Sequence, residues 1–149
     1  MTDTTAPATA GRTPWHFWVV AVLALLWNGM GAYDYVMTQT ENAGYLAMFT
    51  PEQVEYFTSW PLWLDTVWAI GVWAAVLGAI LLILRRAWAV WLFALSLLAV
   101  IIYAVYTLAS PDARAVLGAF MMGSCVLMVV VAAFEYLYSQ AMKKRGVLR

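Results

Sequence analysis

The composition of the chain is that of a membrane protein. Of its 149 residues, 65% are hydrophobic and 11% are charged, and the mean hydropathy is +0.80, whereas a soluble domain carries about 25% charged residues. This balance excludes a soluble globular enzyme. Eight basic and eight acidic residues give a net charge of zero, so the chain has no excess of positive charge to bind nucleic acid. One cysteine and one histidine exclude a disulfide scaffold and a Cys/His metal site, so we expect neither a metal nor a cofactor.

Four stretches are long and apolar enough to cross a bilayer, which takes about 20 residues in a helix. They cover residues 15–37, 61–84, 87–108 and 115–138. No alternation of period two indicates a barrel, and a segment in lipid must satisfy its own backbone hydrogen bonds. The sequence therefore predicts an all-α polytopic membrane protein, in which residues 15–138 form one bundle of four transmembrane helices. The alternative for the first stretch is a cleavable signal peptide, although its apolar character continues through Val36.

The basic residues lie almost entirely on one side of the predicted spans. Seven of the eight precede the first span, separate the second from the third, or follow the fourth: Arg12, Arg85, Arg86, Lys143, Lys144, Arg145 and Arg149. Only Arg114 lies on the other side. The positive-inside rule then predicts that both termini are cytoplasmic. Residues 1–14 are predicted to be a disordered cytoplasmic tail and residues 139–149 a basic cytoplasmic tail.

The segment between the first two spans is too long for a tight turn and carries a strong signal for a helix start. Thr50 is a good N-cap, Pro51 suits the first helical position, and Gln53 is placed to close a capping box. A short amphipathic helix should follow, resting on the outer surface of the bilayer. It serves either as a lid that packs on the bundle or as a gate or docking surface.

Polar residues inside the spans are the best indicators of a functional site, because burying them in lipid is expensive. Asn28 lies near the middle of the first span and either bonds a neighbouring helix or contacts a solute. Asp34 lies at the C-terminal end of that helix, where the helix dipole disfavours an anion, whereas Asp65 begins the second span, where the dipole favours it. Arg114, the single outer cation, could pair with either carboxylate, and we predict Asp34 as its partner. That pair either braces the bundle or marks a carboxylate site for a cation or proton.

Two further side chains of the fourth span have predicted roles near its ends. Glu135 lies close to the predicted cytoplasmic end, at a depth similar to that of Arg85 and Arg86, so we expect an ion pair there. Cys125 lies deep in the span with no cation nearby, which predicts an inert packing residue.

Small residues recur at every fourth position in two of the spans, a pattern that lets helix backbones approach closely. The two ladders are Gly71, Ala75 and Ala79 in the second span, and Ala115, Ala119 and Gly123 in the fourth. They predict a compact bundle or a dimer seam.

Three segments resemble a known group of proteins: WNGMGAYDYVMTQT, FTPEQVEYFTSWP and WAIGVWAAVLG. They look like small four-helix bacterial membrane proteins that are similar in plan to DoxX-like proteins and are sometimes labelled as sugar transporters. The resemblance implies a bacterial inner-membrane location and four helices, and it implies no catalytic residues.

Two functions are compatible with these patterns. The first is a small-solute transporter that works as a homo-oligomer, with Asn28, Asp34 and Asp65 around an outward-facing vestibule and Trp27 or Trp68 as its apolar wall. The second is an accessory or assembly subunit of a larger membrane complex. Apart from the lipid bilayer, the expected partners are therefore further copies of the chain or other membrane subunits. We do not expect an enzyme, because the sequence has no nucleophile and base pair, metal cluster or phosphate loop.

Overall fold

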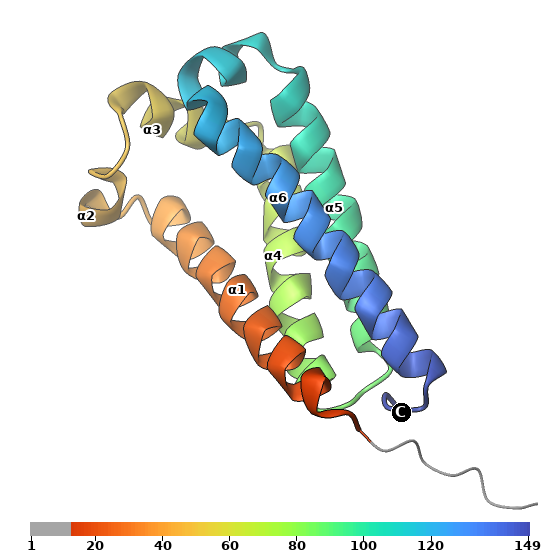
Figure 1. Cartoon of the computed structure of the whole chain (residues 1–149). Coiled ribbons are helices and arrows are strands. Elements are labelled where there is room, and N and C mark those ends of the chain that lie inside the picture. The colour runs from red at the N-terminus through yellow and green to blue at the C-terminus, as the bar shows by residue number, and fades with distance from the viewer. Residues whose placement is uncertain (1–12) are drawn as a thin grey trace, which may run out of the picture.

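The computed structural model describes residues 13–149, and every regular element in that range is a helix (Figure 1). In chain order they are α1 (Trp15–Gln39), α2 (Ala43–Leu46), α3 (Pro51–Thr58), α4 (Leu62–Ile83), α5 (Ala89–Ala109) and α6 (Pro111–Lys144). Four of these helices, α1, α4, α5 and α6, are long and apolar enough to span a membrane. The predicted fold class is confirmed. Of the predicted N-terminal tail, residues 1–12 lie outside the described residues.

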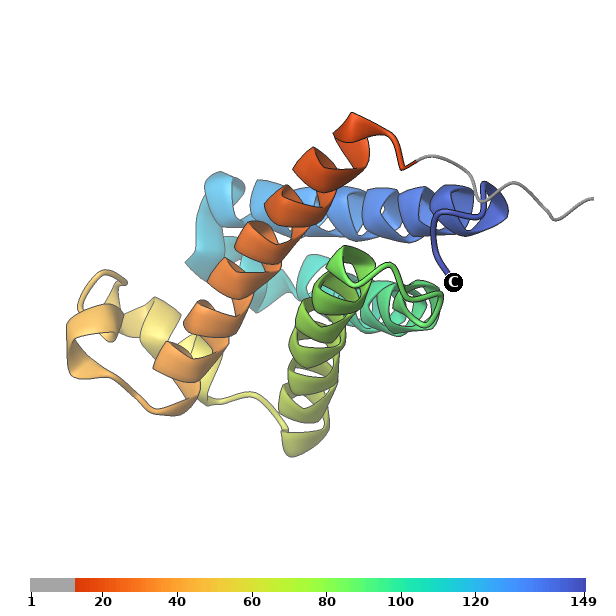
Figure 2. The same cartoon turned by 90° about the horizontal axis from the view of Figure 1, so that it is seen from below.

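The four long helices form one bundle, in which small residues let α4 approach α5 closely. Helix α4 packs against both α1 and α5, and α6 packs against α5. Figures 1 and 2 show α1 and α6 on one side of the bundle, with α4 and α5 behind them. A Cβ added at Gly71 would lie 3.0 Å from the Cβ of Ala99, and one added at Gly78 would lie 3.2 Å from the ring of Phe93. The absence of side chains at these glycines therefore allows the close approach of α4 and α5.

The two predicted ladders of small residues have different environments. Gly71, Ala75 and Ala79 are buried on α4, so this ladder packs within the bundle. The ladder on α6, in contrast, is exposed at all three of its positions. It makes no tight helix contact within the described part of this chain.

One end of the bundle, which we call the basic end, contains the hydrophobic core. It holds the start of α1, the turn between α4 and α5, and the end of α6, with most of the basic residues of the chain. The buried core residues are Phe17, Ala21, Ala24, Ala79, Leu82, Ala89, Val90, Phe93, Met142, Val147 and Leu148. All of them belong to this end, so the bundle is packed most densely there.

The segment after α6 docks on the basic end. Val147 and Leu148 are buried, the amide of Ala87 donates to the carbonyl of Arg149 at 2.8 Å, and the amide of Arg149 donates to the carbonyl of Arg85 at 2.8 Å. The Nε of Arg85 donates to the carbonyl of Val147 at 3.1 Å. The predicted basic tail, residues 139–149, is therefore helical up to Lys144 and then tied to the turn between α4 and α5.

The opposite end, which we call the far end, is covered by α2 and α3. Helix α3 begins with a capping box, in which the Oγ1 of Thr50 accepts from the Gln53 amide and the Gln53 side chain accepts from the Thr50 amide. The Nε2 of Gln53 also donates to the carbonyl of Val116 on α6 at 3.3 Å. One glutamine therefore both starts α3 and ties it to the bundle.

Helix α6 is longer than the predicted span at both ends and is interrupted near its start. It begins at Pro111, where the hydroxyl of Ser110 accepts from the amide of Ala113 at 3.3 Å. Gly118 has a positive φ of 69° and is not helical, a conformation that glycine adopts without steric cost. This break follows closely after Val116, whose carbonyl accepts the hydrogen bond from Gln53. Helix α3 is therefore anchored next to the point where the helical hydrogen bonding of α6 is interrupted.

Candidate functional site

A cavity of about 370 Å³ lies between the four long helices. It reaches from the middle of the bundle to the far end, where residues near α3 contribute to its wall. Its size falls in the range of small-molecule sites, about 300–1,000 Å³. Most of its lining is apolar or aromatic, and two carboxyl side chains, Glu135 and Asp34, reach its wall from α6 and α1.

The first carboxyl group is buried in the middle of the bundle. Glu135 is 5% exposed and Asn28 is 9% exposed, and the Nδ2 of Asn28 donates to the Oε1 of Glu135 at 2.8 Å. The same Nδ2 also donates to the carbonyl of Ala24 at 2.9 Å. Among residues 13–149, Asn28 is the only hydrogen-bond partner of the Glu135 side chain, and no cation pairs with it. A buried carboxyl without a cation is costly unless a proton or a bound cation neutralises it.

The second carboxyl group lies nearer the far end. Asp34 is half-buried and accepts a hydrogen bond from the hydroxyl of Tyr45 on α2. Burial and this bond to Asp34 together raise the pKa of Tyr45 above its ordinary value. Tyr45 therefore stays protonated and donates to Asp34 throughout the physiological range of pH. Asp34 and Asn28 are six residues apart on α1, or about 9 Å along the helix axis.

An aromatic cluster covers the cavity at the far end. Phe49, Phe57 and Trp60 line it from the segment between α1 and α4, and Trp68 and Tyr103 line it from α4 and α5. The ring centroids of Trp60 lie 5.4 Å from those of Trp68 and of Tyr103, and those of Phe49 and Phe57 are 5.5 Å apart. The rings of Phe57 and Trp60, 6.1 Å apart, join the two groups, so these tilted and edge-to-face contacts make the cover one connected layer. The segment around α3 thus lies over the cavity. This is the segment for which the sequence predicted a helix resting on the outer surface of the bilayer.

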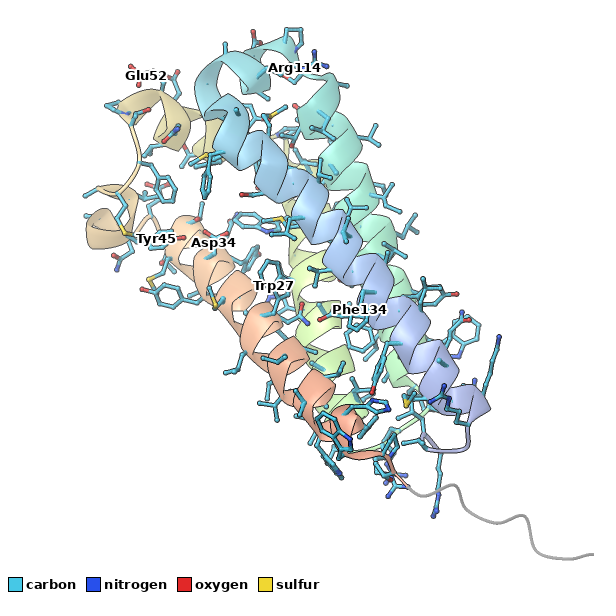
Figure 3. All side chains as sticks on the ribbon, in the orientation of Figure 1. Trp27, Asp34, Tyr45, Glu52, Arg114 and Phe134 are labelled. Atoms are coloured by element: carbon cyan, nitrogen blue, oxygen red, sulfur yellow. The ribbon has the colours of Figure 1, made fainter. Side chains whose placement is uncertain are left out.

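The structure gives Asp34 and Arg114 different partners from the predicted ones. Asp34 bonds to Tyr45, while the guanidinium of Arg114 donates to the carbonyl of Leu108 at 2.7 and 3.1 Å. Figure 3 shows Asp34 beside Tyr45 and Arg114 away from both, in the first turn of α6. The predicted pair of Asp34 and Arg114 is wrong, because α2 folds back over the end of α1 and brings a donor closer than any cation.

The predicted ion pair of Glu135 with Arg85 and Arg86 is also wrong. Helix α6 continues to Lys144, nine residues beyond Glu135, so the carboxyl lies about 13 Å inside the end of the helix. Arg85 bonds the carbonyl of Val147 instead. In the sequence, the basic run after residue 142 indicates where the fourth span meets the membrane interface. Measured from that run, Glu135 lies inside the span and not at its end.

The remaining predicted site residues divide between the cavity and other places. Asn28 and Asp34 line it together with Trp27 and Trp68, which the sequence proposed as apolar walls. Asp65 does not line it, and its Oδ1 accepts from the Nε2 of Gln39 at 3.4 Å. Sequence reasoning missed Tyr45 and Trp60, because only the return of the chain over the bundle brings them to the site. It also missed Tyr103, because only the packing of α5 in the bundle brings this residue to the cavity wall.

Comparisons with known proteins give no family for this chain. No family model matches it, and neither a curated protein nor a solved structure is significantly similar to it. The chain is therefore described by its architecture, as a small multi-pass membrane protein with four spanning helices. Within residues 13–149, no group of three or more His, Cys, Asp and Glu side chains is placed to hold a metal ion.

Proposed function

We propose that the chain binds and transports a small, mainly apolar molecule that carries one positive charge. The observation that supports this function is the buried carboxyl of Glu135, which faces an aromatic cavity and has no cationic partner among the described residues. A cationic ligand would neutralise it, and the aromatic faces of Trp27, Trp60 and Trp68 would attract the same charge.

The proposal includes the orientation of the protein and the membrane in which it lies. With the basic end in the cytoplasm, as the positive-inside rule favours, the aromatic cover faces outward and Glu135 lies on the cytoplasmic side of Asp34. We place the protein in the bacterial inner membrane. Residues of one chain line the cavity, and homo-oligomerisation stays a separate prediction.

A pair of isosteric ligands tests the charge requirement. Benzyltrimethylammonium and neopentylbenzene have the same shape, but only the first is charged. In lipid nanodiscs the protein should bind the cation at least about tenfold more tightly, which corresponds to about 1.4 kcal/mol. Glu135→Gln should abolish this preference while binding of the neutral isostere persists, because glutamine keeps the acceptor for Asn28. Glu55→Gln on exposed α3 is the matched control and should keep the preference.

Two results would contradict the proposed function. Equal affinity for both ligands in the parent protein would show that the cavity does not recognise charge. A preference that survives Glu135→Gln would show that another group recognises it. Flux of the cation from proteoliposomes then separates transport from binding alone, and a protein that neither binds nor transports but co-purifies with other membrane proteins would support the accessory-subunit hypothesis.

A further inference from the structure

The seam between α1 and α6 differs from the other helix seams of the bundle. Helix α4 packs on α1 and α5, and α5 packs on α6, along their lengths, but α1 and α6 have no comparable backbone contact. Figure 2 shows α1 running obliquely to α6. Within residues 13–149, two side-chain hydrogen bonds join these helices: His16 to Tyr138 at 2.9 Å, and Asn28 to Glu135 at 2.8 Å. Both lie on the basic-end side of the cavity, so beyond them the seam has no polar closure.

The cavity reaches the outer surface of the bundle along this open part of the seam. Among its lining residues, Met30 on α1 is 69% exposed and Met128 on α6 is 39% exposed. Trp27, which also lines the cavity, is 38% exposed. Gly31 lines it as well, and a Cβ at that position would meet no atom within 4 Å. Side chains that are exposed and also line the cavity mark an opening, and its edges are unbranched methionines that change rotamer easily.

The opening faces lipid. It lies between two membrane-spanning helices, and its neighbours Leu26 on α1 and Leu127 on α6 are large, apolar and exposed. At the far end, in contrast, Phe49, Phe57 and Trp60 cover the cavity. A molecule that reaches the cavity through the seam must therefore come from the bilayer, which suits an apolar body attached to a single charged group.

We infer that α1 and α6 form a lateral portal, with Met30 and Met128 at its edges, through which a lipophilic cation passes between the bilayer and the cavity. This inference rests on the proposed function, because it assumes the cationic solute that Glu135 binds. Charge complementarity favours this occupant over the acyl chain of a lipid, since a hydrocarbon chain would leave the Glu135 carboxyl buried and uncompensated.

Bulky labels at matched positions test the portal. In a Cys125→Ala background, Met30→Cys and Met128→Cys carry a pyrene maleimide at the proposed edges. Gly29→Cys and Leu127→Cys carry the same label at the adjacent positions, which are exposed but do not line the cavity. Stopped-flow tryptophan fluorescence in nanodiscs measures association and dissociation of benzyltrimethylammonium. Labels at the two edges should slow both rates at least about tenfold, whereas labels at the neighbours should leave them unchanged.

The outcomes separate the portal from the proposed function. If the unlabelled background protein binds the cation and edge labels leave its rates unchanged, the solute passes elsewhere and the portal is wrong while the function stands. Equal slowing at edge and neighbouring positions would also overturn the portal, because the label would then act without regard to place. If the parent protein shows no preference for the cation over neopentylbenzene, the proposed function fails and the inference fails with it. Release of a bound lipid on labelling Met30→Cys, in place of slowed cation exchange, would assign the cavity to an acyl chain.

Discussion

The basic end and the far end of the bundle are built from the same four helices but pack in opposite ways. At the basic end, Phe17 and Phe93 are fully buried and the segment after α6 adds Val147 and Leu148 to the core. At the far end, the helices enclose a cavity whose cover comes from the connection between α1 and α4. The comparison teaches that apolar helices alone do not specify a solid core. The decisive factors are which side chains meet and whether another segment fills the remaining space.

Polar groups explain part of this difference. Asn28 and Glu135 lie near the boundary between the two regions and bond each other across the seam between α1 and α6. Beyond them, Gly31 and Gly118 place no side chain where one would have room. At the basic end, in contrast, the space beside Gly78 is filled by the ring of Phe93 from α5. Small residues thus give close packing where a large neighbour meets them and open space where none does.

The largest effect should come from removing a large side chain at the basic end. Phe93 is 1% exposed and packs against Gly78, so Phe93→Ala should lower the free energy of unfolding by about 3–5 kcal/mol. Phe57→Ala at the far end, where the ring is only half-buried, should cost clearly less. Unfolding of both variants in mixed micelles gives the comparison. Equal losses would mean that the two ends are packed alike.

Double-mutant cycles at the far end should show that Asp34 is coupled to Tyr45 and not to Arg114, the partner that the sequence suggested. Asp34→Asn and Tyr45→Phe should show a coupling free energy of about 1.5–3 kcal/mol, as hydrogen bonds to charged groups do. The cycle of Asp34→Asn with Arg114→Gln should show none, because Arg114 bonds the carbonyl of Leu108. Coupling in the second cycle and not in the first would restore the predicted brace.

A smaller and local effect is expected in the cover. Thr50→Ala removes the N-cap of α3 and should destabilise that helix by about 1 kcal/mol. Hydrogen exchange of the α3 amides should accelerate while α4 and α5 keep their protection. Thr58→Ala is the control, since the Thr58 hydroxyl bonds the carbonyl of Val54 within the same helix and caps nothing. Unchanged exchange in Thr50→Ala would mean that contacts with α6 alone hold α3 in place.

The smallest effect should be a pH dependence of the same helix. The backbone amide at the start of α3 and the Thr50 hydroxyl lower the pKa of Glu52 below its ordinary value of 4.5. Ionised Glu52 therefore stabilises α3 above about pH 4.5, and this contribution is lost as the pH falls through the lowered pKa. As the pH is lowered from about 5, hydrogen exchange should show that α3 opens more often in the parent protein. The Glu52→Gln variant should show no such increase, because its side chain does not ionise. An identical pH profile in both would exclude Glu52 as its cause.

The number and type of the spanning elements follow from the sequence alone. Runs of apolar residues of bilayer length fix four spanning helices, because a chain in lipid must satisfy its backbone hydrogen bonds locally. The start of α3 was equally readable, because Thr50, Pro51 and Gln53 act within one turn. The sequence also picked out Asn28 and Asp34, since polar groups in apolar helices are visible without knowledge of the fold.

The hydrogen-bond partners of these polar groups and the position of the cavity, in contrast, depend on how the helices assemble. The bond between Asn28 and Glu135 joins residues 107 positions apart, and the extent of α6 beyond Glu135 decides whether that carboxyl is at an interface or inside the bundle. Tyr45 reaches Asp34 because the chain turns back after α1. Such pairings depend on helix crossing angles and loop paths, which are set by packing over the whole chain and leave no periodic mark in the sequence. The cavity has the same origin, because an empty volume belongs to no residue and exists only between assembled helices.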